Sequence, residues 1–250
     1  MLCVIMSKRS DTMLMKAFTM SYDDGVFQDR RLVHLMNKYG LKGTFNLNSG
    51  LIQKGEPEKR WTNEKVMRFY RNRVPSVRMI RDDLPELYRG HEVAIHGVNH
   101  IQLKDATKEE TEIELLNDQK ALSELFGYKI EGGAFAYCQT NEYVADIFKQ
   151  AGIKYCRGGG STGNFDPWED MYYYVPTCHH ADENLFDLAK QFIELKVDKP
   201  QIFYVWGHSY EFDYEEEMWE RIEEFFKLIS GHDDIIYGTN LEVFKYFNLV

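Results

Sequence analysis

Two adjacent carboxylates, Asp23 and Asp24, are the side chains of this sequence that most plainly suggest chemistry. They lie in the segment Ala17-Phe-Thr-Met-Ser-Tyr-Asp-Asp-Gly25. The residues before them form an apolar run typical of a buried strand, and Gly25 indicates a turn, so both carboxylates are expected at the end of a core strand, where loops carry function. Adjacent like charges are costly unless water or a cation neutralises them. We therefore expect one carboxylate to hold a metal ion and the other to handle a proton.

Further polar side chains follow other strand-like runs. His96 and His100 follow the third run, Tyr137 and Gln139 follow the fourth, and His208 follows the seventh. The carboxyl ends of parallel strands meet at one face of a barrel or an open sheet, which is where active sites form. Two histidines and one carboxylate leave coordination positions open for water and substrate. Since a bound divalent metal lowers the pKa of water toward about 7, the set predicts metal-assisted hydrolysis.

Each of these features also has an ordinary interpretation. The two histidines of His96-Gly-Val-Asn-His100 could merely hydrogen-bond within a loop, and Asp-Asp-Gly could be a simple turn. His208 could be a satisfied core histidine. The occurrence of all of them at successive strand ends favours a joint site. The pair His179-His180 also follows a strand-like run, and we interpret it as a surface pair.

Composition narrows the class of protein. The chain has 250 residues, of which 44% are hydrophobic and 14% aromatic, so it is globular and long enough to bury a full core. A net charge of -10 without an offsetting basic block disfavours nucleic acid and anionic membranes as partners. A small-molecule or oligosaccharide substrate that is neutral or cationic is the expected ligand. The four cysteines show no CxxC spacing and are interpreted as buried or idle thiols.

The order of the elements predicts one domain over residues 1–250. The first residues contain only a short apolar run with no basic segment before it, which favours a cytoplasmic protein. The sequence does not define the oligomeric state. Strand-like runs occur at 13–22, 43–48, 92–96, 133–138, 153–157, 172–177, 201–207 and 234–238. Helical patterns occur at 27–39, 107–126, 141–150, 184–195 and 215–229.

The alternation of eight strands with helices predicts parallel βαβ units and, at this length, a barrel. The clearest helix is the one at 107–126, where Thr107 and Glu110 form a capping box and Gly127 marks the end. A basic, aromatic stretch over 51–85 interrupts the alternation. We expect it to be an elaborated, solvated crossover with a helix around 63–72, and the alternative is that it lines a substrate groove.

These motifs resemble those of the polysaccharide deacetylase family, the carbohydrate esterases with a NodB-type domain. Ser21-Tyr-Asp-Asp-Gly25 resembles the family's Thr-Phe-Asp-Asp-Gly, and His96-Gly-Val-Asn-His100 resembles its His-Ser/Thr-x-x-His. Val205-Trp-Gly-His208 is similar to its late Leu-x-His motif. The resemblance spans roughly residues 13 to 240. It implies a distorted (β/α)7-type barrel of parallel strands and one divalent metal ion, often zinc.

The resemblance also implies a role for each residue. Asp23 would be the general base, Asp24, His96 and His100 the metal ligands, and His208 the general acid. The tetrahedral oxyanion would be stabilised by the metal and by a backbone N–H after the fourth strand. The implied reaction removes an acetyl group from an N- or O-acetylated sugar or glycan.

In this chain the segments that align with the family's third and fourth motifs differ from the family's pattern. Ala136-Tyr-Cys-Gln-Thr140 stands where the family has Arg-x-Pro-Tyr-Gly, so the guanidinium that orients the catalytic Asp is expected to be lost. Gln139 takes the place of the Tyr whose backbone N–H serves the oxyanion. Asp166-Pro-Trp-Glu-Asp170 is the candidate fourth motif, with Trp168 as an aromatic wall. Tyr137 and Trp206 are further candidate substrate contacts.

Three other functions are compatible with these residues. Some relatives of the fold hydrolyse cyclic amides or other non-sugar C–N bonds, and the altered third motif makes such a substrate plausible. A second alternative is a carbohydrate-binding relative that has lost turnover, with aromatic side chains stacking on sugar faces. A non-haem iron oxygenase also uses two histidines and a carboxylate. The alternation of helices and strands disfavours that last class.

Overall fold

The core of the fold is a sheet of eight strands in which all paired strands are parallel. The computed structural model describes residues 13–53, 67–69, 75–215 and 217–250. The strands are β1 Lys16–Asp23, β2 Thr44–Leu47, β5 Glu92–Ile95, β6 Gly132–Ala134, β7 Tyr155–Arg157, β8 Cys178–His179, β9 Gln201–Gly207 and β10 Ile235–Tyr237. Their order is β7-β6-β5-β2-β1-β9-β8, and β10 pairs with β1 beside this path.

The sheet curves but does not close into a full barrel. Among the described residues no ladder joins β7 to β8, and the isolated bridge between Arg157 and Tyr174 is the contact nearest to closure. Seven strands therefore follow one another around the path. The predicted distorted (β/α)7-type barrel of parallel strands is confirmed.

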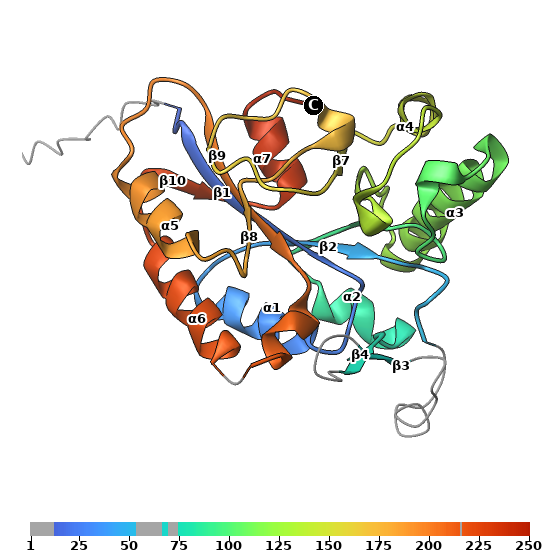
Figure 1. The fold of residues 1–250 in the computed structure, drawn as a ribbon, viewed down its shortest axis with the longest axis horizontal. Helices are drawn as coiled ribbons and strands as arrows, with labels where there is room; N and C mark the ends of the chain where they lie inside the picture. Colours follow the sequence, from blue (N-terminus) through green and yellow to red (C-terminus); the bar gives the residue numbers. More distant parts are fainter. Residues whose placement is uncertain (1–12, 54–66, 70–74, 216) are drawn as a thin grey trace, which may run out of the picture.

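Helices pack against both faces of the sheet, most of them on the face that carries Phe18 and the last on the opposite face, where Asn240 pairs with Thr19 (Figure 1). They are α1 Asp29–Lys38, α2 Leu84–Leu87, α3 Lys108–Phe126, α4 Val144–Ala151, α5 Leu185–Glu194, α6 Met218–Ile229 and α7 Asn240–Tyr246. Helices α1, α5 and α6 lie together along the β1–β9 pair, whereas α3 and α4 lie together at the other end of the sheet. Short 3₁₀ turns follow several strands, namely η5 Ala136–Cys138 after β6 and η7 Ser209–Asp213 after β9.

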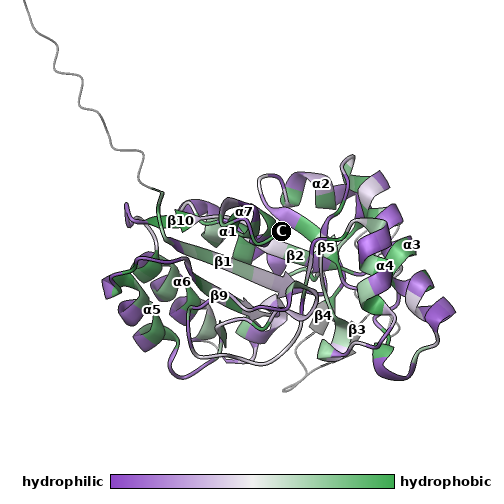
Figure 2. Cartoon of the chain, turned by 90° about the horizontal axis from the view of Figure 1, so that it is seen from above, coloured by the Kyte–Doolittle hydropathy of each residue, from purple (hydrophilic) through white to green (hydrophobic). Residues whose placement is uncertain are grey.

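The central strand β1 is buried along its whole length, because helices or loops cover both of its faces. Its residues alternate along the strand: Phe18, Met20 and Tyr22 belong to the main apolar core, whereas the hydroxyls of Thr19 and Ser21 on the other face hydrogen-bond to Asn240 and Tyr204. Phe18 of β1 packs against Phe203 of β9 and Phe225 of α6, with ring centroids 5.6 and 5.8 Å away. Figure 2 shows the corresponding pattern, with hydrophilic residues on the outward faces of α3 and α5.

The best-defined helix of the sequence is confirmed in detail. The Thr107 hydroxyl accepts a hydrogen bond from the Glu110 backbone N–H, and the Glu110 side chain accepts one from the Thr107 N–H. Gly127 ends the helix in the left-handed conformation at φ 75°. Such a reciprocal cap pairs backbone donors that a helix otherwise leaves exposed. Helix α3 therefore begins and ends where the sequence predicted.

Two predictions of secondary structure are wrong. Residues 172–177 were expected to form a strand, but Met171–Tyr173 form a 3₁₀ turn that the Asp170 side chain caps. The helix expected around 63–72 is contradicted at Met67–Phe69, which form strand β3 and pair antiparallel with β4 at Pro75–Val77. The rest of that segment, like the N-terminal run in residues 1–12, lies outside the described residues. Within the described part of the chain no helix combines the length and apolar character needed to cross a bilayer.

Candidate functional site

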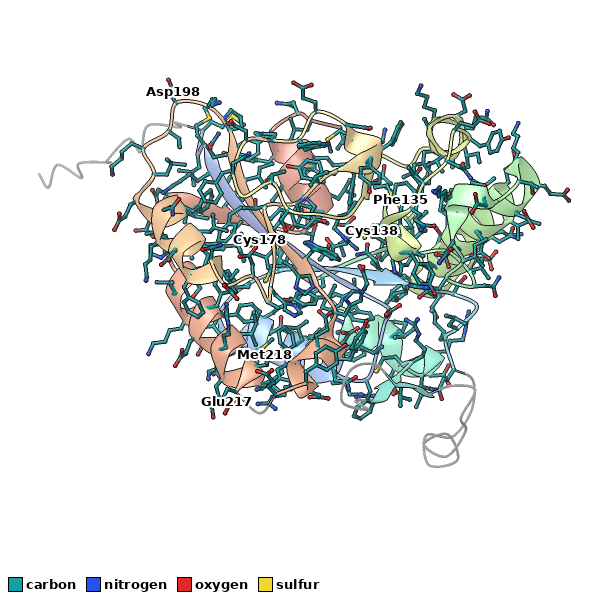
Figure 3. All side chains as sticks on the ribbon, viewed as in Figure 1. Phe135, Cys138, Cys178, Asp198, Glu217 and Met218 are labelled. Carbon is teal, nitrogen blue, oxygen red and sulfur yellow. The ribbon has the colours of Figure 1, made fainter. Side chains whose placement is uncertain are left out.

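The carboxyl ends of β1, β5, β6 and β9 open into one cavity of about 210 Å³. The parallel register aligns these ends, with Asp23 of β1 opposite Asn46 of β2 and Tyr22 opposite Gly207 of β9. The residues lining the cavity are Asp23, Asp24, His96, His100, Phe135, Tyr137, Cys138, Trp206, His208 and Tyr210. In Figure 3 the labelled Phe135 and Cys138 lie beside each other, between the β1–β9 pair and helix α3. The predicted convergence of strand ends is therefore what the structure shows.

Asp24, His96 and His100 form a group that could hold a metal ion. One ligand atom from each lies within 4.8 Å of the other two, and all three residues are buried. The Nδ1 of His96 lies 2.8 Å from the carbonyl oxygen of Ala134, which places the proton on Nδ1 and leaves Nε2 free to bind a metal. Asp24 Oδ1 is buried and accepts no aligned hydrogen bond in the described part of the chain. The donor set therefore fits a divalent transition metal with open positions.

Helix α3 fixes the loop that carries the two histidines. Asp118 accepts hydrogen bonds from the backbone N–H groups of Ser49 and His96, at 2.7 and 2.9 Å. Glu114, one turn earlier, accepts from both the backbone and the side chain of Asn99, at 2.8 and 2.7 Å. Burial raises the pKa of Asp118 to about 7 although these donors oppose the shift. The loop is thus held by side chains of a rigid element, which preorganises the imidazoles.

The first carboxylate, Asp23, is oriented by an arginine that the sequence analysis missed. Arg157 at the end of β7 donates from Nη2 to Asp23 Oδ2, and Asn46 donates from Nδ2 to Oδ1 at 2.8 Å. Burial alone would raise the pKa of Asp23, but the guanidinium and two neighbouring imidazoles bring it below its usual value. Our expectation that Ala136 deprives Asp23 of a guanidinium is therefore wrong. Ala136 is buried at the turn after β6, and the charge comes from the adjacent strand.

A signal for this arginine does exist in the sequence. Arg157 directly follows the strand-like segment Ile153-Lys-Tyr-Cys156, and three glycines follow it. Like the two aspartates, Arg157 is a charged residue at the carboxyl end of a core strand, directly before a turn. Its pairing partner could not be inferred, because that depends on β7 joining the sheet beside β6, in the register that sets Arg157 opposite Ala134.

The second carboxylate, Asp24, has an arginine of its own. Arg78 Nη1 lies 2.7 Å from Asp24 Oδ1 and also donates to the backbone carbonyl of Asp24. Burial would raise the pKa of Asp24, but Arg78 and the nearby histidines hold it well below the usual range. The adjacent carboxylates are thus each paired with a separate buried cation. We had assigned their joint ionisation to a metal ion, whereas the structure pairs each with a guanidinium.

The imidazole of His208 lies between two carboxylates. Its Nε2 is 3.8 Å from Asp23 Oδ2, and its Nδ1 is 3.4 Å from Glu211 Oε1. Burial alone would lower the pKa of His208, but the hydrogen bond to Glu211 and the charge of Asp23 raise it to about 9. The ring is therefore protonated at neutral pH, as a general acid must be.

Glu211 is the carboxylate that partners the ring of His208. Its Oε2 lies 3.1 Å from Nε2 of His179 and 3.2 Å from Nε2 of His180, and it accepts from the His208 backbone N–H at 3.1 Å. The pair was interpreted as a surface feature, but His180 is buried and stacks on Phe212, with ring centroids 4.3 Å apart. The i,i+3 spacing of His208 and Glu211 in a turn was the signal available in the sequence.

His179, His180 and Glu211 are also close enough together to be considered as a metal site. The hydrogen bonds argue otherwise. The Ala181 backbone N–H donates to Nδ1 of His179 at 3.1 Å, so the proton of that ring is on Nε2 and points to Glu211. A metal would need the lone pair at the same nitrogen. His179 is therefore placed as a donor to Glu211 and not as a metal ligand.

The turn after β6 carries unusual backbone geometry. Tyr137 and Cys138 have φ values of 56° and 57°, and Asp24 and His100 also have positive φ. Non-glycine residues in this region are strained, and such residues gather at functional sites. Gln139, our expected oxyanion donor, uses its N–H for the Ala136 carbonyl at 3.2 Å. Within the described residues the Tyr137 N–H has no acceptor, and Tyr137 lines the cavity.

The predicted aromatic contacts divide into two groups. Tyr137 and Trp206 line the cavity, and the Trp206 ring lies 4.4 Å from the guanidinium carbon of Arg157. Trp168 is 40% exposed and is not among the residues that line the cavity. Asp166, in the same segment, instead pairs with Lys199 at 2.7 Å. The structure therefore brings Tyr137 and Trp206 to the site but not Trp168.

Comparison with known proteins gives one family. The family model described as polysaccharide deacetylase matches residues 11–156, more than half of the chain. No curated protein sequence matches. A structure from Mycobacterium smegmatis, ascribed to a polysaccharide deacetylase, aligns with a TM-score of 0.62 and 12% identity, covering 96% of this chain and 92% of its own.

Two further solved structures share the fold. A family 4 acetyl xylan esterase from Clostridium thermocellum, in complex with a cobalt ion, aligns with a TM-score of 0.56 and 12% identity over 92% of this chain and 91% of its own. The Streptococcus pyogenes deacetylase PplD, in complex with acetate, aligns with a TM-score of 0.50 and 15% identity. That alignment covers 63% of this chain and 62% of the streptococcal one, so it spans less than two thirds of either.

Proposed function

The chain belongs to the polysaccharide deacetylase family, and on that premise we propose that it is a metal-dependent hydrolase that removes an acetyl group from an N- or O-acetylated sugar or glycan. The observation that carries the proposal is the single cavity in which a carboxylate with a buried arginine, a potential metal-binding triad and a protonated histidine all meet. Each of these groups has a distinct task in hydrolysis.

Asp24, His96 and His100 would hold one divalent ion, for which zinc is the first candidate. The cobalt ion in the related acetyl xylan esterase supports a transition metal in such a fold. When bound, the ion would supply Lewis-acid polarisation of the acetyl carbonyl and would lower the pKa of an attacking water. The Nε2 of His96, whose ring proton is on Nδ1, and the Oδ1 of Asp24, which also contacts Arg78, are the atoms suited to hold it.

Asp23 acts as the general base. Its pKa lies below the usual value, so the carboxylate is ionised and can accept a proton from the attacking water. Arg157 and Asn46 fix the two oxygens, which restricts the carboxylate to one orientation. A base that is held in place loses little freedom on reaching the transition state.

His208 acts as the general acid on the opposite side of the cavity. Its Nδ1 faces Glu211 Oε1 at 3.4 Å, so the Nε2 proton faces Asp23 and the interior of the site. This proton would be transferred to the leaving nitrogen or oxygen of the sugar. The Tyr137 backbone N–H is the donor that we assign to the oxyanion, because the N–H of Gln139 is already used.

The alternative of a carbohydrate-binding relative without turnover is weakened by these contacts. It was based on the altered third motif, and Arg157 provides the charge that this motif lacks. An acetylated sugar and a cyclic amide are alternative substrates for the same catalytic groups, because both reactions would use the same base and the same acid.

The direct test measures acetate release from a panel of N- and O-acetylated sugars by zinc-loaded protein. Asp23→Asn should abolish release, by a factor of about 10²–10⁴, because the amide cannot accept the proton. Asp166→Asn, which changes an exposed carboxylate outside the cavity, is the matched control. Equal activity of wild type and Asp23→Asn on every substrate would refute the mechanism. Turnover of a cyclic ureide with none of the sugars would instead decide for the non-sugar amide.

A further inference from the structure

Arg78 is a buried cation of the site that the proposed reaction does not use. Its side chain is only 8% exposed, and its Nη1 lies 2.7 Å from Oδ1 of Asp24. The same nitrogen donates to the backbone carbonyl of Asp24. Arg78 therefore contacts both the side chain and the main chain of the one carboxylate in the proposed ligand set.

The backbone holds Arg78 in this position. The Phe27 N–H donates to the Val77 carbonyl at 2.8 Å, and the Met79 N–H donates to the Gly25 carbonyl at 2.8 Å. These two bonds flank Arg78 and dock its segment against the turn that directly follows Asp24. The guanidinium is thus fixed by main-chain pairing beside the carboxylate.

The charges around the proposed metal ligands indicate that the contact between Arg78 and Asp24 affects metal binding. Asp24 is the only anion of the set, because His96 and His100 would bind a metal as neutral imidazoles. Arg78 places a positive charge against that anion, so the three ligands and the arginine sum to zero. Asp23 next to them is already paired with Arg157. A divalent ion would therefore enter a site whose negative charge is largely compensated, and charges at such distances inside a protein interact strongly.

We propose that Arg78 is a built-in counter-ion of the metal site, which holds the Asp24 carboxylate in its ligand position and lowers the affinity of the site for a divalent ion. The consequence is a metal that exchanges with the medium. This inference rests on the proposed function, because it requires Asp24 to be a metal ligand.

A purely positional role would predict the opposite effect on affinity. Asp24 has a strained backbone, with φ 85°, and Arg78 clamps its carbonyl. If clamping were the whole role, the loss of Arg78 would misplace the ligand and weaken metal binding. If charge compensation dominates, the loss of the charge strengthens binding. The sign of the change therefore separates the two roles.

The experiment titrates the metal-stripped 250-residue protein with Zn²⁺ in competition with a chromogenic chelator at neutral pH. Arg78→Gln keeps a hydrogen-bond donor but loses the charge, and we expect its zinc dissociation constant to fall at least about tenfold. Arg78→Lys keeps the charge and should stay within about threefold of wild type. Arg30→Gln, an exposed arginine of α1 that pairs with Asp83, is the matched control and should not change.

An unchanged or weaker affinity in Arg78→Gln would overturn the inference. Circular dichroism and thermal unfolding establish that the variant is folded, and Arg78→Met replaces it in the titration if it is not. Asp24→Asn distinguishes this failure from that of the proposed function. If Asp24→Asn binds zinc like wild type, the proposed metal centre is wrong. If it loses zinc while neither neutral variant at Arg78 binds more tightly, only the role of Arg78 is wrong.

Discussion

Arg157 Nη2 donates to Asp23 Oδ2 in an ion pair that is shielded from solvent, since Arg157 is fully buried and Asp23 nearly so. The contact joins the last residue of β7 to the last residue of β1, across three intervening strands of the sheet. It restores, from another strand, the guanidinium that the sequence motif after β6 lacks. Asp23 therefore has a guanidinium partner although the turn after β6, with Ala136, supplies none.

Replacing Arg157 should impair Asp23 as a base. In Arg157→Met the pKa of Asp23 rises, because the strongest lowering influence is removed while burial remains. The acidic limb of the kcat/KM profile should move to higher pH, and kcat should fall by about tenfold or more. Stability should change as well, because a depressed carboxylate pKa stabilises the fold above about pH 4 and that stabilisation is lost as pH falls.

The control for this prediction is Arg221→Met. Arg221 packs over the Phe186 ring and donates to the Asp182 carbonyl, outside the cavity. Its pH profile should match that of wild type. If Arg157→Met and wild type gave the same acidic limb and the same kcat, the ion pair would have no part in orienting Asp23.

Glu211 should set the alkaline limit of activity. In Glu211→Gln the pKa of His208 falls from about 9 toward the ordinary value of about 6.5, because its largest raising influence is gone. Since His208 must be protonated to donate, the alkaline limb of kcat/KM should move to lower pH. Glu220→Gln, an exposed glutamate of α6, is the matched control. An unmoved alkaline limb in Glu211→Gln would exclude this pairing.

The same pKa links His208 to stability. A histidine whose pKa is raised on folding stabilises the protein fully below the unfolded value of about 6.5. That contribution is lost as pH rises through about 9. Urea unfolding of wild type should therefore show stability declining over this window, and the decline attributable to His208 should shrink in Glu211→Gln.

The positions of the site residues could be predicted because they depend on the local order of the chain. Parallel strands share one carboxyl edge, so residues that directly follow strands must converge. The predicted residues that line the cavity are Asp23, Asp24, His96, His100, Tyr137, Trp206 and His208. Their roles as ligand, base or acid remain part of the proposed function.

What could not be predicted depends on long-range pairing or on competing local bonds. Arg157 meets Asp23 only because β7 joins the sheet next to β6, a partnership that no single segment encodes. The run at 172–177 has residues that favour a strand, yet the Asp170 side chain accepts from the Tyr172 N–H and stabilises a turn instead. Arg78 lies in the 51–85 stretch, which interrupts the alternation of strands and helices. Its contact with Asp24 depends on the bridge that pairs its backbone with that of Val26.

Metal analysis should distinguish the cluster that contains His96 and His100 from the cluster that contains His179 and His180. We expect one zinc ion per chain in the reconstituted protein, lost in His96→Gln and in His100→Gln. His179→Gln should retain it, because the Nε2 proton of His179 points to Glu211 and leaves no lone pair for a metal. Elemental analysis of each purified variant gives the ratio of metal to protein. Loss of an equal amount of zinc in His179→Gln would mean that the second cluster binds metal too.

Gly207 should be required to keep the Glu211 carboxylate in position beside His208. A Cβ at this position would lie 2.1 Å from Nδ1 of His180, and that ring is held between Tyr22 and Phe212. Gly207→Ala should therefore cost about 1–3 kcal/mol in the free energy of unfolding, as overpacking of a core does. The displaced ring would also disturb Glu211, so the alkaline limb of activity should shift as in Glu211→Gln.

Gly43→Ala is the matched control, because its Cβ would closely approach the flexible end of Met36, at 3.1 Å, and would lie at an ordinary contact distance of 3.7 Å from the Met20 carbonyl oxygen. We expect it to unfold at nearly the urea concentration of wild type. If Gly207→Ala also unfolds like wild type and keeps the wild-type alkaline limb, the tight packing of His180 beneath the site is not what positions Glu211. A loss of stability with an unchanged pH profile would instead mean that this packing supports the fold but not the acid.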